Sequence, residues 1–201
     1  MRPHDLLRLK PHARLVADAV PAWVDASLSR TPFVVIRRAH RTDGLIAVGI
    51  RGETRAERFP ALIPRDSVAT VITPESLTAG KKWRSTPRSR LPIFLALETV
   101  DRAAAAIDLA WGIGGGAGFE LATGHATVSD TSDLDIILRP SPSHTHETLR
   151  ALRDDLSRLD VRVDPVVEVG QESVALDEWL ASPQRVMIKT PHGPRLGAFS
   201  W

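Results

Sequence analysis

The clearest hydrophobic pattern in the chain is a set of leucines at helical spacing in its second half. Leu149, Leu152, Leu156 and Leu159 are spaced so that all four fall on one face of a helix. Directly after them, residues 160–164 read Asp-Val-Arg-Val-Asp, an alternation typical of a strand with one polar face. The pattern therefore predicts a helix followed by a half-exposed strand.

The rest of the second half shows the same mixture of helix and strand patterns. Short runs of β-branched and apolar residues predict strands over 107–111, 134–138 and 185–190. Helices are expected from about Pro92 to Ala105, through Phe119–Ala122 with an end at Gly124, and over 174–181. Strands alternating with helices predict a layered domain of the α/β or α+β class.

The first half predicts a smaller domain of helix and strands. A helix is expected within residues 13–29, and apolar runs predict strands over 33–36, 45–50 and 68–72, the first two as a hairpin. Pro60 and Pro64 exclude a helix in the Arg-rich stretch 51–65. Residues 79–92 are rich in Lys, Arg, Ser, Gly and Pro and are typical of a linker, so we predict domains over 1–80 and 81–201.

Composition excludes several classes of protein. Hydrophobic residues make up 43% and charged residues 25%, an ordinary globular balance that argues against disorder. No run approaches the roughly 18 apolar residues of a membrane span, and the first residues lack an apolar signal core, so we expect a cytoplasmic protein. The absence of cysteine leaves only oxygen and imidazole ligands for a metal.

Charge is distributed unevenly along the chain. The net charge of +2 divides into +8 over residues 1–100 and −6 over residues 101–201. A basic half beside an acidic half suits a polyphosphate ligand and a divalent cation. Aromatic residues make up only 5% and no nucleic-acid-binding motif is visible, so we expect no nucleic-acid partner.

Three features in the second half carry candidate chemistry. A glycine cluster centred on Gly115 and Gly116 lies between a predicted strand and a predicted helix, where backbone N–H groups can approach phosphate. Asp133 and Asp135 then lie two residues apart, about 6.6 Å along a strand, and share one face of it. Asp160 would supply a third carboxylate from the next strand, which completes an oxygen site for Mg²⁺.

The third carboxylate has a competitor four residues further on. Asp164 shares the strand face of Asp160. We favour Asp160 because hydrophobic residues flank it on both sides, whereas Pro165 follows Asp164. The sequence alone does not separate the two.

The ordered pattern resembles the nucleotidyltransferase superfamily typified by polymerase beta, whose signature is a Gly-Gly or Gly-Ser turn, an Asp-hydrophobic-Asp strand and a third acidic residue. Over nearly the whole chain the sequence more closely resembles the family of malonate decarboxylase holo-acyl-carrier-protein synthases, also called phosphoribosyl-dephospho-CoA transferases. The densest stretch is Gly118–Gly124, followed by Ser132-Asp133-Leu134-Asp135. Other matching stretches lie at 4–7, 49–52, 109–112, 178–179, 186–190 and 193–196.

The resemblance implies an α+β fold, with a polymerase-beta-like nucleotidyltransferase domain of mixed sheet and flanking helices after a smaller mixed N-terminal domain. It also implies transfer of phosphoribosyl-dephospho-CoA from triphosphoribosyl-dephospho-CoA to a serine of the apo acyl-carrier subunit of malonate decarboxylase, with Mg²⁺ as cofactor and pyrophosphate as leaving group. Asp133, Asp135 and Asp160 would bind the metal and act in catalysis. The expected substrate-binding residues are Gly115, Gly116, Ser132, Lys189, Arg51, Arg55 and Arg58.

Two other functions remain as alternatives. The first is a nucleotidyltransferase acting on RNA or on a small-molecule hydroxyl. The second is a nonenzymatic module whose basic N-terminal half binds nucleic acid, for which a steep salt dependence of RNA binding would be the signature.

Overall fold

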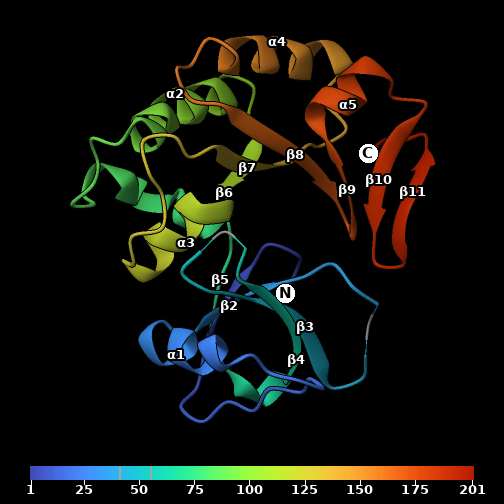
Figure 1. Cartoon of the computed structure of the whole chain (residues 1–201). Coiled ribbons are helices and arrows are strands. Elements are labelled where there is room, and N and C mark those ends of the chain that lie inside the picture. Colours follow the sequence, from blue (N-terminus) through green and yellow to red (C-terminus); the bar gives the residue numbers. More distant parts are fainter. Residues whose placement is uncertain (41, 55) are drawn as a thin grey trace. The chain divides into compact units, whose positions relative to one another are not determined.

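Two separate sheets organise the chain in the computed structural model, which describes residues 1–40, 42–54 and 56–201 (Figure 1). One sheet belongs to the N-terminal unit, Met1–Thr73, and the other to the C-terminal unit, Pro74–Trp201. The division thus falls before Pro74 and not at the predicted position after residue 80. Pro74 belongs with the second sheet because its carbonyl accepts a hydrogen bond from Ile113 N–H at 3.1 Å.

The N-terminal unit is an antiparallel five-stranded sheet with one helix. Its strand order is β4-β3-β2-β1-β5. The alternate residues Ile46, Val48 and Ile50 of β3 form a buried core with Val24 of α1. The elements are β1 (Leu6–Leu9), α1 (Ala22–Arg30), β2 (Phe33–Ile36), β3 (Leu45–Arg51), β4 (Arg58–Pro64), the short 3-10 helix η1 (Arg65–Ser67) and β5 (Val68–Ile72).

The predicted helix and three strands of this unit are confirmed, and two strands were not predicted. The hairpin pairing of β2 with β3 is confirmed by the partners Val35 and Gly49. The strand β1 was missed, as was β4, because Pro60 and Pro64 suggested broken structure. Proline is tolerated in β4 because β4 is the edge strand of the sheet.

Residues 79–92, predicted as a linker, are packed against the C-terminal unit. After the 3-10 helix η2 (Glu75–Leu77), the 3-10 helix η3 (Ala79–Arg84) brings Trp83 to 1% exposure, and the Trp83 indole donates to Glu98 Oε1 at 2.7 Å. Arg84 binds the same carboxylate through two bonds of 2.7 and 2.6 Å. The polar composition of this stretch therefore serves ion pairing with the helix that follows.

The C-terminal unit is a mixed six-stranded sheet with order β11-β10-β9-β8-β7-β6. Only β7 and β8 are parallel, and the other neighbours are antiparallel. Figure 1 shows α2, α4 and α5 as a layer over one face of this sheet. The elements are α2 (Pro92–Ala106), β6 (Ala110–Ile113), α3 (Gly115–Thr123), β7 (Leu134–Arg139), α4 (His146–Leu156), β8 (Val163–Val169), β9 (Glu172–Ala175), α5 (Leu176–Ala181), β10 (Val186–Thr190) and β11 (Gly193–Gly197).

Most predicted elements of this unit are confirmed, and the α+β class with them. The predicted helix 174–181 is wrong at its start, because Val174 and Ala175 end strand β9. The strand predicted over 160–164 begins only at Val163, and β11 was not predicted.

Alternation along β7 determines where its acidic residue points. Leu134, Ile136 and Leu138 are fully buried, as expected for side chains beneath the helix layer. Asp135 lies between them in sequence and therefore projects from the opposite face, where it is only half-buried. This second face of the sheet, on which Ile137 is also buried, carries the candidate site.

Candidate active site

The glycine turn that opens α3 lies directly against Asp135. The N–H of Gly114 donates to the Asp135 carbonyl oxygen at 3.0 Å. Gly115 has φ +55°, and a Cβ built on it would come within 1.8 Å of Asp135 Oδ2. Only glycine therefore fits at this position, and the glycine cluster lies beside the Asp-Leu-Asp motif.

A second acidic residue is the register partner of Asp135 on the neighbouring strand β8. In the parallel register of β7 and β8, Asp135 is the partner of Asp164. Register partners on adjacent strands point to the same face with backbones about 4.8 Å apart. Arg162 Nε donates to Asp164 Oδ1 at 3.0 Å, but both side chains are more than a third exposed, so this pair is weak.

The other two predicted carboxylates lie outside the strands. Asp133 precedes β7 by one residue and is half-buried. Asp160 is exposed in a bend before β8, because the hydrogen bonding that joins these strands starts at Arg162, whose carbonyl accepts from Leu134 N–H at 2.8 Å. Asp164, and not the favoured Asp160, is therefore the acidic residue in register with the Asp-Leu-Asp motif.

The donor set suits a hard divalent cation that is shared with a ligand. Within residues 1–40, 42–54 and 56–201 there is no group of three or more His, Cys, Asp or Glu residues arranged to hold a metal by itself. Mg²⁺ usually takes only one or two protein carboxylates and completes its octahedron with water and substrate phosphate oxygens. The carboxylates of Asp135 and Asp164 fit that mode of binding, and Asp133, one residue before β7, is a further candidate ligand.

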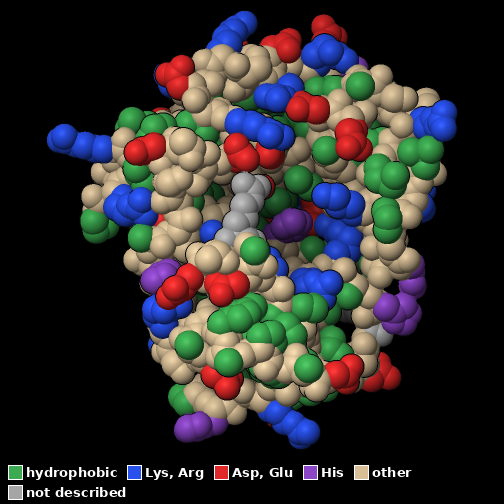
Figure 2. Space-filling model, in the orientation of Figure 1, with side chains coloured by type: hydrophobic (Ala, Val, Ile, Leu, Met, Phe, Trp, Pro, Cys, Tyr) green, Lys and Arg blue, Asp and Glu red, His purple; other side chains and the backbone are tan. Residues whose placement is uncertain are grey.

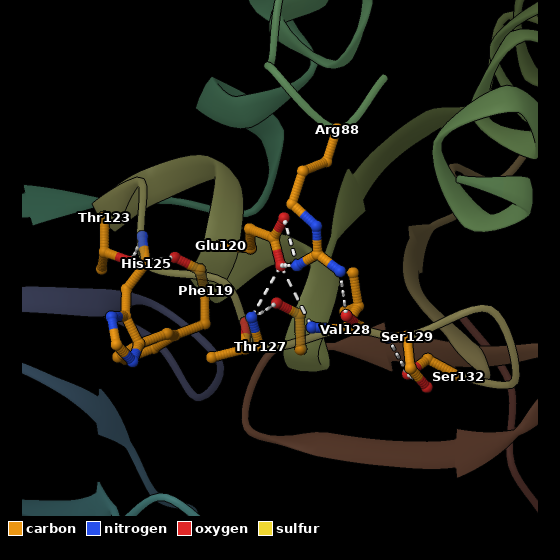
Figure 3. A network of polar contacts seen from close by, with 10 residues as sticks. Arg88, Phe119, Glu120, Thr123, His125, Thr127, Val128, Ser129 and Ser132 are labelled. Carbon is orange, nitrogen blue, oxygen red and sulfur yellow. Dashed lines mark hydrogen bonds and ion pairs between the residues drawn. The ribbon is translucent and has the colours of Figure 1, made fainter. Parts of the chain in front are cut away.

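The loop that leads to Asp133 is held by Ser132, a predicted substrate-binding residue, and by Glu120, which the sequence did not single out for chemistry. Ser132 Oγ accepts from Ser129 N–H at 2.9 Å, which closes a turn just before Asp133. Further back, the buried carboxylate of Glu120 binds the backbone of Thr127 and Val128 (Figure 3). Glu120 falls within the Gly118–Gly124 stretch that carries the family resemblance, and this is the only sequence signal that could have found it.

Of the predicted basic residues, Lys189 belongs to the same unit as this site but does not lie at it. Lys189 is exposed on β10, three strands from β7 in the sheet. Arg51 and Arg58 belong to the N-terminal unit, where they are direct cross-strand partners on β3 and β4. Arg58 Nη1 donates to the backbone carbonyls of Thr54 and Glu57 at 3.3 and 3.0 Å. Arg55 lies outside the described residues.

Charge differs between the two units less sharply than between the two halves of the sequence. The N-terminal unit holds 12 Lys and Arg against 7 Asp and Glu, net +5, and the rest of the chain has net −3. Figure 2 shows basic and acidic side chains interspersed on the visible face of each unit. In the part of the chain that the structure describes, no helix has the length and apolarity to cross a membrane.

Two family models together match almost the whole chain. Residues 2–74 match the Phosphoribosyl-dephospho-CoA transferase MdcG N-terminal domain. Residues 82–198 match the C-terminal domain of the same family. The two matches correspond closely to the two structural units.

Individual relatives cover the full chain as well. The chain is 38% identical over 201 residues to a phosphoribosyl-dephospho-CoA transferase of Azotobacter vinelandii, spanning 100% of this chain and 94% of the relative. A protein of the same name from Pseudomonas putida is 40% identical over 200 residues, spanning 100% and 95%. One from Pseudomonas aeruginosa is 37% identical over 200 residues, spanning 99% and 93%. No solved structure matches the chain.

Proposed function

The chain belongs to the phosphoribosyl-dephospho-CoA transferase family, and from this premise we propose that it attaches phosphoribosyl-dephospho-CoA to a serine of the apo acyl-carrier subunit of malonate decarboxylase. The donor in this proposal is triphosphoribosyl-dephospho-CoA. The catalytic domain in this proposal is a polymerase-beta-like nucleotidyltransferase domain formed by the C-terminal unit.

One geometric observation carries the proposal. Asp135 and Asp164 are register partners on one face of the sheet, and the backbone at Gly115 approaches Asp135 Oδ2 so closely that no side chain fits. A pair of carboxylates next to a glycine turn at a helix N-terminus suits a phosphate chain neutralised by Mg²⁺. Phosphoryl transfer needs little more from a protein than positioning and charge neutralisation.

The proposed reaction is a single displacement at phosphorus. The serine oxygen of the carrier forms a bond to the α-phosphorus of the donor, and the bond from that phosphorus to the bridging oxygen of the β-phosphate breaks. Pyrophosphate leaves with the bond electrons, and the serine proton passes to a carboxylate base. The product is a phosphodiester between the prosthetic group and the carrier.

The residues divide between those that would hold Mg²⁺ and those that would contact the phosphates or the carrier. Asp135, Asp164 and Asp133 would hold Mg²⁺, which neutralises the triphosphate and the charge that develops on pyrophosphate. The α3 backbone at Gly115 and Gly116 would contact the phosphate chain. Ser132, Lys189, Arg51, Arg55 and Arg58 remain candidates for contacts to the phosphates or to the carrier.

The intact mass of the apo carrier subunit tests the proposal. Incubation with the wild-type protein, Mg²⁺ and triphosphoribosyl-dephospho-CoA should increase its mass by that of the donor minus pyrophosphate. EDTA should abolish the increase. Asp164→Asn should slow the reaction by at least about 100-fold, because loss of a direct metal ligand should have a larger effect than loss of a residue that only orients a ligand. Asp160→Asn is the matched control and should stay within a few-fold of wild type.

Two outcomes would contradict parts of this proposal. No mass gain with folded wild-type protein would reject the donor or the carrier, and nucleoside triphosphates would then be screened for release of pyrophosphate. A large loss in Asp160→Asn with little change in Asp164→Asn would restore Asp160 as the third carboxylate.

A further inference from the structure

The carboxylate of Glu120 is buried and hydrogen-bonded, at the end of the buried stretch Ala117–Glu120 of the short helix α3. Its side chain is 3% exposed. Glu120 Oε2 accepts the backbone N–H of Thr127 at 2.7 Å and that of Val128 at 3.0 Å. A buried carboxylate is costly unless it is paired and hydrogen-bonded, so these contacts must persist for the helix to stay in place.

Arg88 completes the arrangement from the segment before α2. Its Nη1 lies 3.2 and 3.1 Å from the two oxygens of Glu120, and its Nη2 donates to the Val128 carbonyl at 2.7 Å. Figure 3 shows the guanidinium between the Glu120 carboxylate and the Val128 backbone. Glu120 and Arg88 thus bind both polar groups of the Val128 backbone, and we call them the loop clamp.

The loop clamp and the glycine turn lie on the same helix, α3. The glycine turn is fixed to Asp135, and the loop clamp fixes the loop that leads to Asp133. At its start, α3 is fixed to Asp135 by the hydrogen bond from Gly114 and the close approach of Gly115. Near its end, Glu120 fixes the loop that runs from Gly124 to Asp133. A further bond, from Thr127 Oγ1 to the Gly116 carbonyl at 3.0 Å, joins this loop to the first turn of α3.

The path from the loop clamp to Asp133 is short and closed. Val128 is followed by the turn in which Ser129 N–H donates to Ser132 Oγ at 2.9 Å and Ser132 N–H donates to the Ser129 carbonyl at 3.2 Å. Asp133 comes next, and Leu134 begins β7. Asp133 is therefore held between two fixed points, the clamped Val128 and the sheet.

We propose that Glu120, with Arg88, is a positioning residue that sets Asp133 beside Asp135 for binding of the divalent cation. The inference rests on the proposed function and adds to it a determinant of cation affinity that touches neither cation nor substrate. Residues that orient metal ligands from the second layer typically change metal affinity or activity by about 10- to 100-fold when replaced.

The test compares Glu120→Gln with wild type in two measurements. The first is the Mg²⁺ concentration that half-saturates carrier modification, which should rise about 10- to 100-fold because the amide presents a donor to Arg88 and opens the clamp. The second is hydrogen exchange of the peptide covering 127–133, measured without metal or substrate. Exchange there should become faster, whereas the thermal midpoint should report any general loss of stability.

Glu98→Gln is the matched control. It removes a carboxylate from another Glu–Arg pair, with Arg84, which joins the segment before α2 to α2 itself. The hydrogen bonds of Glu98 go to Trp83 and Arg84 and not to the loop before Asp133. The Mg²⁺ requirement and the exchange of 127–133 should therefore stay as in wild type.

Three outcomes would overturn the inference. The first is unchanged exchange of 127–133 in Glu120→Gln. The second is faster exchange with a Mg²⁺ requirement within about twofold of wild type, since a merely structural role predicts lower stability without a change in cation affinity. The third is a rise in the Mg²⁺ requirement of Glu98→Gln equal to that of Glu120→Gln.

A second variant, Arg88→Met, keeps the inference testable if Glu120→Gln does not fold. Arg88→Met keeps the Glu120 bonds to the loop backbone and removes only the guanidinium, so it should raise the Mg²⁺ requirement in the same direction by a smaller factor. No rise would overturn the inference. If the wild type is inactive, the proposed function fails separately, and hydrogen exchange alone decides whether the clamp orders the loop.

Discussion

At the scale of single residues, the candidate site depends on where Asp135 lies, against the glycine turn at Gly115 and in register with Asp164. The Asp-Leu-Asp spacing and the glycine cluster could be found in the sequence because each lies within a few consecutive residues. The pairing of Asp135 with Asp164 could not, because it depends on the register between β7 and β8, which is set by the whole crossover through α4. Local alternation placed Asp160 and Asp164 on the same strand face, and the flanking residues favoured Asp160. The register between the strands distinguishes the two, because it pairs Asp164 with Asp135.

Gly115 offers a sharp test at this scale. Gly115→Ala should cost about 1 kcal/mol of stability because alanine is strained at φ +55°. It should also slow carrier modification by about 100-fold, since the new Cβ must displace the Asp135 carboxylate and misplacement by about 1 Å has an effect of that order.

Gly124→Ala is the control for this substitution. For both variants, urea denaturation measures the loss of stability, and the rate of carrier modification measures the loss of activity. Gly124 has φ +74° but no atom within 4 Å of a built Cβ, so it carries the backbone strain without the clash. Equal transfer rates in the two variants would contradict the close approach at Asp135.

At the scale of elements, strongly periodic segments could be predicted and segments defined by distant partners could not. The leucine face of α4 and the apolar run of β7 were visible in the sequence. The strands β4 and β11 were missed because proline and glycine suggest turns, although an edge position tolerates both. The polar composition of residues 79–92 suggested a linker. In the structure their side chains pair with α2, which no local pattern reveals.

The contact of Glu98 with that segment should be visible in the pH dependence of stability. Hydrogen bonds from Arg84, and then from Trp83, lower the pKa of Glu98 from 4.5 to about 2. A carboxyl group whose pKa is lower in the folded state stabilises the protein above the unfolded-state pKa and loses this contribution as pH falls toward the folded-state pKa.

Wild type should therefore be more stable than Glu98→Gln near pH 6, and the difference should shrink between pH 4.5 and about 2. Chemical denaturation at several pH values in this window measures it. A difference that stays constant with pH would show that the ion pair with Arg84 is not formed in solution.

At the scale of the whole molecule, both units belong to one family and carry charges of opposite sign. Family membership supports an enzyme and removes the support for a nonenzymatic nucleic-acid-binding module. The N-terminal unit, with net +5, contains the cross-strand pair Arg51 and Arg58. A net positive charge speeds association with an acidic partner and does so less at high salt.

If the carrier subunit is acidic, kcat/KM for it should fall on the order of tenfold between low and high salt. Arg58→Glu should lower kcat/KM at low salt and flatten the salt dependence. Arg158→Glu, a charge reversal on an exposed arginine of the C-terminal unit, is the control and should leave the slope unchanged. Equal slopes in wild type and Arg58→Glu would exclude this arginine from carrier docking.

The interior position of β1 in the first sheet has a consequence for synthesis of the chain. Strand β1 lies between β2 and β5, and every strand pair described in this sheet is complete at Ile72, before the first residue of the C-terminal unit. Folding during translation proceeds from the N-terminus, domain by domain. A nascent chain can therefore close its first sheet outside the ribosome while the residues of the glycine turn and the aspartates are still being added, so the two sheets need not compete for strands.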